Sequence, residues 1–323
     1  MLATPKPTSY GFIGLGLMGL PMCKSLATKI GPGHQIHVFD INEAAMNQLY
    51  QDQPDMISRC SSAAEVAEGA DIILTMLPEG RHAESVYLSG PHALASRSLE
   101  GKLLIDCSTI DPATSLSIKE QLHFSFPTAS FYDAPVSGGV IGAVKGSISF
   151  FVGCDEATDT LFPSVIQPTL RMMGKQIIPC GGPSLGLTAK LCNNYLSGIL
   201  TIACSETFNI SMRAGLNPKK LYQVLGAGSA QNTICDKFCP VPNVNPQSPS
   251  SHGFKGGFRM ALMLKDFTLA TQITERGGAQ RILSARGLEM YSLLSEDSQY
   301  KNLDVRAIFR YLGGQEDWDE RHG

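Results

Sequence analysis

The chain contains 323 residues, 43% of them hydrophobic, with 26 basic and 29 acidic side chains and a formal net charge of −3. This length exceeds the size at which a single hydrophobic core usually stops growing, so we expect two domains. The two signs of charge are mixed along the chain without a basic block, which excludes a phosphate-backbone footprint and predicts that nucleic acid is not a partner.

Cysteine usage and hydropathy restrict the class of protein further. The nine cysteines include no CxxC pair, so we interpret them as reduced intracellular thiols and expect no metal. The longest apolar runs, Ile72–Leu77 and Ile199–Ala203, are far shorter than the roughly 20 residues that cross a bilayer, so we expect a soluble protein with no membrane partner. About ten residues precede the first predicted strand, and they lack the apolar core of a signal peptide.

Apolar, strand-like runs alternate with helical stretches through the first half of the chain. A crossover helix is expected over Leu20–Ile30, ending at the Gly31-Pro32-Gly33 turn. This alternation predicts a parallel sheet covered by helices. A further strand pair, Ser147–Val152 and Gln176–Pro179, is expected to extend that sheet. The five runs that define the sheet are Tyr10–Ile13, Gln35–Asp40, Ile72–Met76, Leu103–Asp106 and Phe131–Ala134.

The second half of the chain has a different pattern, without strand signals. Ser184–Arg213 predicts one helix of about 45 Å, too long for a single compact layer, so we expect it to link the two domains. Cys239–Gly257 is a proline-, serine- and glycine-rich loop between helices. The polar tail Gln315–Gly323, which holds the single tryptophan, Trp318, is expected to fray and to carry no catalytic group.

A glycine-rich turn directly follows the first predicted strand and opens a helix, the context that a dinucleotide-binding fingerprint requires. Gly14 permits the tight turn, Gly16 lets the backbone approach a pyrophosphate, and Gly19 lets helix and strand pack closely. An ordinary glycine turn is the alternative. The sequence therefore predicts a Rossmann-type domain whose cofactor contacts include Gly14, Leu15, Gly16, Leu17, Met18 and Gly19.

Asp40 ends the second predicted strand, about 20 residues beyond the last glycine of the turn, where a carboxylate can accept hydrogen bonds from ribose hydroxyls. Its charge would repel a 2′-phosphate, and no arginine follows in Ile41-Asn42-Glu43. The pattern therefore favours NAD over NADP. The alternative is a solvated aspartate that caps the next turn.

Lys190 and Asn194 lie four residues apart, on one face near the start of the long predicted helix. A lysine in an apolar helix needs a partner or a task, because burying an ammonium group without compensation is costly. A desolvated lysine can become neutral and accept a proton. A solvent-facing lysine beside a helical amide is the competing interpretation.

Four motifs in this order resemble the β-hydroxyacid dehydrogenase family, and the resemblance covers nearly the whole chain. They are Phe12–Gly19, the segment Asp133–Gly139, the helix around Lys190, and Lys265-Asp266. The resemblance implies that Lys190 is the catalytic acid/base and that Asn194 helps to hold the substrate. It also implies that a turn formed by Ser137, Gly138 and Gly139 binds the substrate carboxylate.

The residue types of this turn agree with that role. Ser137 supplies a hydroxyl, and two successive glycines let backbone N–H groups turn toward an anion. The turn follows a predicted strand, so it lies beyond a carboxyl end, where open α/β sheets bind ligands. Structural glycines in a turn are the alternative.

By resemblance, Leu77, Pro78 and Thr109 line the NAD site, and Lys265 reaches the cofactor from the helical domain. Without the resemblance, Lys265-Asp266 would be a solvated charge pair. The chain departs from the family pattern at two positions. Ser184 stands where the family has the middle one of three glycines, which affects local backbone geometry more than chemistry. His82 replaces an asparagine, so one cofactor hydrogen bond can differ.

Together these features predict an NAD-binding Rossmann-like domain over residues 1–182 and an all-helical substrate and oligomerisation domain over residues 183–323, joined by the long helix. The loop around Cys239 and the Gly256-Gly257-Phe258 segment resemble 3-hydroxyisobutyrate dehydrogenases more than their relatives, so we expect NAD-dependent oxidation of 3-hydroxyisobutyrate in valine catabolism. Alternatives are a related hydroxyacid dehydrogenase, a semialdehyde or glyoxylate reductase, and a non-catalytic dinucleotide-binding module. The resemblance also implies a homo-oligomer, in the mitochondrial matrix or the cytoplasm.

Overall fold

The computed structural model describes residues 8–319. The chain divides into two compact units, an N-terminal unit that ends at Lys190 and a C-terminal unit that begins at Leu191. Residues 1–7, most of the segment that lacks the apolar core of a signal peptide, and the last four residues of the polar tail lie outside the described part.

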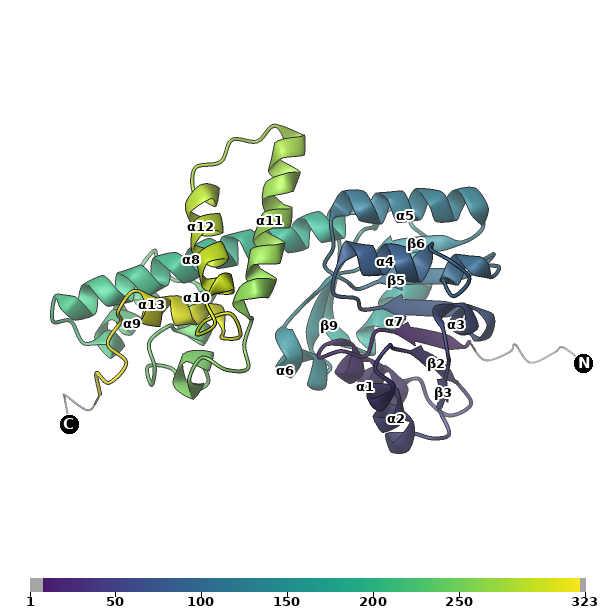
Figure 1. Cartoon of the computed structure of the whole chain (residues 1–323), viewed down its shortest axis with the longest axis horizontal. Coiled ribbons are helices and arrows are strands. Elements are labelled where there is room, and N and C mark those ends of the chain that lie inside the picture. Colours follow the sequence, from purple (N-terminus) through teal and green to yellow (C-terminus); the bar gives the residue numbers. More distant parts are fainter. Residues whose placement is uncertain (1–7, 320–323) are drawn as a thin grey trace, which may run out of the picture. The chain divides into compact units, whose positions relative to one another are not determined.

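Within the described residues, six strands of the N-terminal unit form one parallel sheet in the order β3-β2-β1-β4-β5-β6 (Figure 1). The chain moves outward from β1 to β3, then returns and moves outward the other way from β4 to β6, so the order reverses between β1 and β4. In such sheets ligands bind outside the carboxyl ends of the strands at this reversal. The strands are β1 Tyr10–Ile13, β2 Ile36–Phe39, β3 Ile57–Arg59, β4 Ile72–Thr75, β5 Leu103–Asp106 and β6 Ser130–Asp133.

Both faces of this sheet are covered, which explains the continuous apolar runs in its central strands. Successive side chains of a strand point to opposite faces. Accordingly, Ile105 joins the core on the side of α1, whereas Leu104 joins the core on the opposite side. The covering helices are α1 Gly19–Lys29, α2 Glu43–Asp52, α3 Ala63–Gly69, α4 Gly80–Tyr87 and α5 Pro112–Ser125.

The five predicted strands are confirmed, and β3 is an additional strand of three residues, too short to give a sequence pattern. The expected extension of the sheet by two further strands is wrong. β8 (Ile148–Val152) and β9 (Gly174–Pro179) pair with each other in a separate sheet, together with β7 (Val136–Ser137). On the side of β6 that faces away from β5, two backbone bonds reach β8 and its end: Pro135 O accepts from Phe151 N at 3.0 Å, and Asp133 O accepts from Gly153 N at 2.8 Å.

The long helix is confirmed as α8, Leu185–Arg213, which runs through the boundary between the two units. The rest of the C-terminal unit is helical: α9 Pro218–Ala227, α10 Thr233–Phe238, α11 Met260–Gly277, α12 Ser284–Glu296 and α13 Ile308–Tyr311. The remaining helices of the N-terminal unit are the short α6 (Gly139–Val144) and α7 (Gln167–Arg171). No helix within residues 8–319 is long and apolar enough to cross a membrane.

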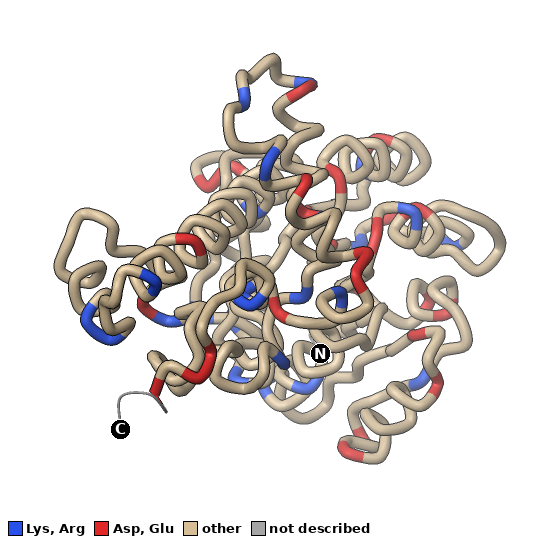
Figure 2. Tube along the Cα trace, turned by 60° about the vertical axis from the view of Figure 1, so that its left-hand side comes forward, with Lys and Arg blue, Asp and Glu red and all other residues tan. Residues whose placement is uncertain are grey.

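Positions occupied by lysine or arginine are interspersed with positions occupied by aspartate or glutamate along the chain trace (Figure 2). Several are paired on the surface, such as Lys24 with Asp52 at 2.6 Å. The mixed pattern expected from the sequence is therefore present in the fold.

The expectation that the tail frays is wrong for the part that the structure describes. Trp318 is only 4% exposed and packs into a core of the C-terminal unit with Phe208 and Phe309. Its indole Nε1 donates to the carbonyl of Pro242 at 2.8 Å. A tryptophan in a polar tail can anchor that tail, because its ring buries a large apolar area while its N–H finds an acceptor.

Replacing this anchor tests its contribution to the C-terminal unit. We expect Trp318→Ala to lower the free energy of unfolding by about 3–5 kcal/mol, the usual cost of deleting a buried aromatic ring, as measured by urea denaturation. Phe124→Ala is the matched control, because Phe124 is 90% exposed and should cost less than about 0.5 kcal/mol. Equal midpoints for the two variants would contradict the anchoring role.

Candidate active site

The glycine turn after β1 has the backbone geometry that the fingerprint predicts. Gly14 adopts a positive φ of 94°. A Cβ atom on Gly19 would lie 1.8 Å from the carbonyl oxygen of Gly14, so no side chain fits there. A Cβ atom on Gly16, in contrast, would meet nothing within 4 Å. Gly14 and Gly19 are therefore required by the fold, whereas Gly16 leaves open space beside the turn.

The N-terminus of α1 is available for an anion. Its N-cap, Met18, makes no side-chain capping bond, and Leu20 N donates to Gly16 O at 3.0 Å in the first turn. The N–H groups that precede this bond have no partner inside the helix, and the helix dipole favours negative charge at this end. The turn thus fits the pyrophosphate of a dinucleotide, with Gly16 as the point of close approach.

Asp40 holds the same turn from the end of β2. One carboxylate oxygen accepts from Leu15 N, and the other accepts from Asn42 N at 2.7 Å. Each oxygen has a further lone pair, so the carboxylate can still accept hydrogen bonds from ribose hydroxyls. The sequence did not predict that Asp40 also fixes the glycine turn.

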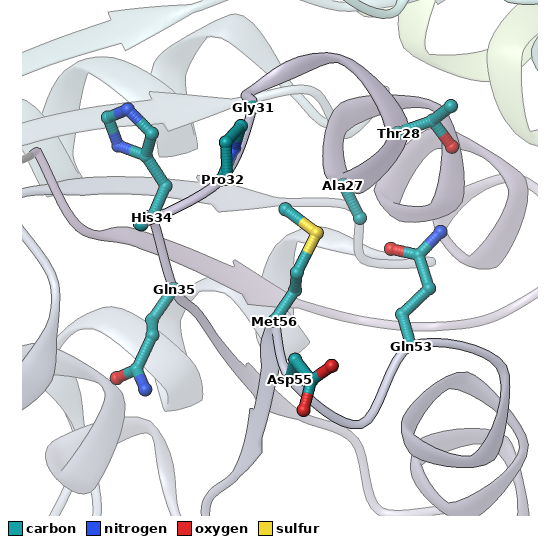
Figure 3. A pocket seen from close by; sticks show the side chains of 10 residues that line it. Ala27, Thr28, Gly31, Pro32, His34, Gln35, Gln53, Asp55 and Met56 are labelled. Carbon is teal, nitrogen blue, oxygen red and sulfur yellow. The ribbon is translucent and has the colours of Figure 1, made fainter.

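The cavities of the N-terminal unit include one beside the glycine turn and one at the other end of α1, and Thr28 lines both. One of about 940 Å³ lies beside the glycine turn and is lined by Leu15, Gly16 and Leu17, together with parts of α1, α2 and α6. The other, of about 600 Å³, lies between the turns that lead into β2 and β3, where His34 and Asp55 line it (Figure 3). Ligands of open α/β sheets bind at the carboxyl ends of the strands, so only the first cavity adjoins the predicted site.

A buried hydrogen-bond network joins the ends of β4 and β5. Oδ1 of Asp106 accepts from Thr75 Oγ1 at 2.7 Å and from Ser108 Oγ at 2.5 Å. The Ser108 hydroxyl oxygen in turn accepts from Leu77 N at 2.8 Å. The hydroxyl of Tyr87 closes the network, 2.8 Å from Thr75 Oγ1. The network therefore fixes the two loops that carry the predicted NAD contacts Leu77, Pro78 and Thr109.

Asp106 is fully buried, and its second oxygen, Oδ2, has no hydrogen-bond partner among the described residues. Burial raises the pKa of this carboxyl group, while hydrogen bonds from Ser108 and Thr75 oppose the rise. A buried carboxyl oxygen without a partner lowers the stability of the fold. The presence of Asp106 at the carboxyl end of β5 therefore indicates a role other than stability. This role of Asp106 was not predicted, although an aspartate at the end of an apolar strand is a usable signal.

Asp133 occupies the equivalent position on the neighbouring strand, where it is paired in register with Asp106. Its Oδ1 accepts from Ser184 N at 2.8 Å, and its Oδ2 accepts from Leu187 N at 2.9 Å. These are N–H groups at the start of α8, so the carboxylate caps that helix from a distant strand. Burial raises the pKa of Asp133, while the bonds from Leu187 and Ser184 act in the opposite direction.

Ser184, which stands where the resemblance implies a glycine, has an unusual backbone conformation. Ser184 has a positive φ of 60°, a conformation that favours glycine. Its hydroxyl donates to Pro112 O at 3.1 Å, a bond that glycine could not make. The serine therefore exchanges backbone strain for a hydrogen bond to the start of α5.

The turn of Ser137, Gly138 and Gly139 begins in β7 and leads into α6. Both glycines have positive φ, 132° for Gly138 and 63° for Gly139. Beside Gly139 the space that a Cβ would occupy is open. The turn starts four residues after Asp133, so one short segment carries both the predicted carboxylate-binding turn and the cap of α8.

Lys190 lies in the second turn of α8 and is buried, with 7% of its surface exposed. In the C-terminal unit, Asn194 Nδ2 donates to Asp266 Oδ2 at 2.6 Å. The other oxygen of Asp266 lies 3.3 Å from Lys265 Nζ. Lys265 and Asp266 therefore do not form a solvated charge pair. Asp266, for which no role was predicted, contacts both Asn194 and Lys265, the two predicted site residues of this unit.

The glycine turn gives a prediction that separates fold from ligand binding. Gly16→Ala should leave the free energy of unfolding within about 0.5 kcal/mol, because its Cβ enters open space, yet weaken NAD binding by blocking close approach of the pyrophosphate. Gly19→Ala should destabilise the chain, because its Cβ collides with the Gly14 carbonyl. Calorimetric titration with NADH and urea denaturation measure both effects. Undiminished NADH affinity in Gly16→Ala would refute this assignment.

Comparison with known proteins places these features in a family. Residues 9–182 match the model of the NAD binding domain of 6-phosphogluconate dehydrogenase. Residues 185–312 match the model described as NAD-binding of NADP-dependent 3-hydroxyisobutyrate dehydrogenase. The predicted NAD-binding domain is thus confirmed, and the fold is the predicted Rossmann-type domain followed by a helical region.

The relatives match over nearly the whole chain. A 3-hydroxyisobutyrate dehydrogenase of Pseudomonas aeruginosa is 36% identical over 96% of this chain and 100% of its own. The mitochondrial 3-hydroxyisobutyrate dehydrogenase of Mus musculus is 36% identical over 96% of this chain and 88% of its own. A solved structure of the Mycobacterium tuberculosis 3-hydroxyisobutyrate dehydrogenase with L-serine has a TM-score of 0.81 and 33% identity, covering 94% of this chain and 99% of its own. The chain therefore belongs to the 3-hydroxyisobutyrate dehydrogenases of the β-hydroxyacid dehydrogenase family.

Proposed function

We propose that the chain oxidises 3-hydroxyisobutyrate to methylmalonate semialdehyde with NAD, a step of valine catabolism. The proposal is supported by a buried lysine, Lys190, which the family resemblance implies is the acid/base, in a chain that is 36% identical to such an enzyme over 96% of its length. A lysine amine held at a fixed position can serve as a proton acceptor and donor.

In this proposal Lys190 accepts the proton of the substrate's terminal hydroxyl at Nζ while the alcohol carbon is oxidised to an aldehyde. Bound NAD supplies the acceptor for the hydride that leaves this carbon. In the reverse direction Lys190 returns the proton to the carbonyl oxygen. The chain itself contributes orientation of the alcohol and a proton acceptor at a fixed position.

Ser137, Gly138 and Gly139 hold the substrate carboxylate in this mechanism. The Ser137 hydroxyl donates a hydrogen bond, and the positive φ angles of the two glycines are of the kind that turns successive N–H groups toward an anion. The open space beside Gly139 leaves room for the ligand. Anchoring the carboxylate also fixes the position of the alcohol carbon, because a single carbon separates the two groups in the substrate.

Asn194 is proposed as a further substrate contact and Lys265 as a cofactor contact, both by their positions in the family motifs. Asp266 supports these roles, because it accepts from the Asn194 amide and pairs with Lys265. A carboxylate between two polar side chains restricts their rotamers, so Asp266 positions both without touching substrate.

The proposed organisation follows the same resemblance. We assign the NAD-binding domain to residues 1–182 and the helical substrate and oligomerisation domain to residues 183–323, and we propose a homodimer or homotetramer. The relatives include a bacterial enzyme and mitochondrial ones, and we propose the mitochondrial matrix or the cytoplasm as the compartment.

A second candidate substrate is L-serine, which is present in the solved structure of the Mycobacterium tuberculosis relative. L-serine and 3-hydroxyisobutyrate share a carboxylate and a terminal alcohol separated by one carbon, and they differ by an amino group in place of a methyl group. A site that binds the carboxylate and the alcohol accommodates both. The substituent on the central carbon then decides between them.

Replacing the lysine tests the mechanism. Lys190→Ala should lower kcat by about 10²–10⁴-fold, the usual contribution of a positioned acid or base, while NADH binding persists because the glycine turn is intact. Lys301→Ala, an exposed lysine far along the sequence, should keep wild-type kcat. Near-normal turnover in Lys190→Ala would end the assignment.

The same assay identifies the substrate when it is run with both enantiomers of 3-hydroxyisobutyrate beside serine, 4-hydroxybutyrate and glycerate. The proposal predicts the highest kcat/KM for one enantiomer of 3-hydroxyisobutyrate. A higher value for another compound would move the chain to a related dehydrogenase or reductase, and NADH binding without turnover of any compound would favour a non-catalytic module.

Asp40 is proposed to select NAD over NADP by repelling a 2′-phosphate. Asp40→Ala should relax the ratio of kcat/KM for NAD to that for NADP toward unity. It should also loosen the glycine turn, because Leu15 N and Asn42 N lose their acceptor, so affinity for both cofactors should fall. An unchanged ratio would refute the selective role while leaving the structural one in place.

A further inference from the structure

The carboxylate of Asp133 connects two segments that are far apart in sequence. It lies at the end of β6, directly before the segment that forms the Ser137-Gly138-Gly139 turn. Its two oxygens accept from Ser184 N and Leu187 N, 51 and 54 residues further along the chain. Leu187 precedes Lys190 by three residues, or just under one turn of α8. All of these residues belong to the N-terminal unit.

The surroundings of Asp133 leave its carboxylate little freedom to move. The side chain is 2% exposed. A Cβ atom on Gly153 would lie 1.8 Å from Oδ1, and one on Gly186 would lie 2.8 Å from Oδ2. The absence of side chains at these two glycines makes room for the carboxylate. The backbone carbonyl of Asp133 is also bound, because it accepts from Gly153 N at 2.8 Å.

We infer that Asp133 is a positioning residue for the proposed reaction: it fixes the first turn of α8, and with it Lys190, relative to the turn that is proposed to hold the substrate carboxylate. The inference rests on the proposed function for its consequence in turnover, but its structural part stands without it. Asp133 acts through backbone groups and touches neither substrate nor cofactor.

The geometry explains why a carboxylate is needed at this position. Two N–H donors converge on one side chain, and only a carboxylate offers an acceptor oxygen to each of them. An asparagine of the same shape keeps one oxygen and turns an NH₂ group toward the other donor. Charge-assisted bonds to backbone N–H groups are also stronger than neutral ones, so the start of α8 should loosen in an amide variant.

The test is Asp133→Asn in the full-length protein, followed first by hydrogen exchange and mass spectrometry. Amides in residues 184–188 should exchange at least about tenfold faster than in the wild type, the effect of losing a charge-assisted bond. Labelling of the Lys190 amine by an acid anhydride should also become faster, because the buried turn that carries it opens. Neither readout depends on activity.

In turnover, kcat of Asp133→Asn should fall by about 10²-fold, the cost of misplacing a catalytic group by roughly 1 Å, while the KM for NAD stays at the wild-type value. A variant that had only lost global stability would not show a lower kcat together with an unchanged KM for NAD. The matched control is Ser62→Ala, which removes the N-cap of α3 in the same unit, where Ser62 Oγ accepts from Glu65 N at 3.2 Å. It should speed exchange near Glu65 alone and leave kcat unchanged.

The outcomes separate the inference from the proposed function. Wild-type labelling of Lys190 and wild-type kcat in a folded Asp133→Asn protein would overturn the inference. So would fast exchange of the Ser184 and Leu187 amides in the wild type, a measurement that needs no variant and decides the matter if Asp133→Asn does not fold. If the wild type turns over no hydroxy acid, the proposed function fails, and exchange and labelling still decide whether Asp133 fixes this helix.

Discussion

Two buried carboxylates at the carboxyl edge of the main sheet hold the parts of the candidate site. Asp106 and Asp133 lie side by side in register on β5 and β6. Asp106 fixes the loops after β4 and β5 through Ser108, and Asp133 fixes the start of α8 through two backbone N–H groups. The proposed cofactor contacts Leu77, Pro78 and Thr109 and the start of the helix that carries Lys190 thus depend on neighbouring residues at the carboxyl ends of β5 and β6.

Burying these two carboxylates lowers the stability of the folded state. Burial raises the pKa of both groups, so the folded state disfavours their ionised forms relative to the unfolded chain. The cost is fully present above the folded-state pKa and is relieved as pH falls through it, because the folded state then takes up the proton first. A fold selected for stability alone would place apolar side chains here. Both aspartates are thus present despite their cost in stability, as expected of residues with a positioning role.

Much of this architecture follows from local sequence patterns. The apolar runs gave five strands, the glycine turn gave the start of α1, and the uninterrupted segment from Ser184 gave α8. These predictions succeeded because each depends on residues near one another in the chain. The predicted position of β8 and β9 was wrong because it depends on strand pairing. β8 pairs with the short β7 and with β9, and local sequence patterns do not specify pairing partners. The prediction that the tail frays was wrong because the burial of Trp318 depends on a distant hydrogen-bond acceptor, the carbonyl of Pro242.

The same distinction between local patterns and distant contacts applies to the candidate site. Local patterns predicted roles for Asp40 and the glycine turns, and the resemblance predicted one for Lys190. Neither indicated the contacts that hold these segments, such as those of Asp133 with the start of α8 and of Asp266 with Asn194. Those contacts join residues more than 50 positions apart, and no local pattern encodes them.

In the proposed mechanism an amine on α8 takes the proton of an alcohol whose carboxylate is held by the turn at Ser137. A crystal structure of the enzyme with NADH and 3-hydroxyisobutyrate would test this arrangement. We expect Lys190 Nζ within about 3.2 Å of the substrate hydroxyl oxygen, with the substrate carboxylate on Ser137 and the two glycines. A substrate bound elsewhere, or a Lys190 amine directed into solvent while Asp133 still caps the helix, would contradict it.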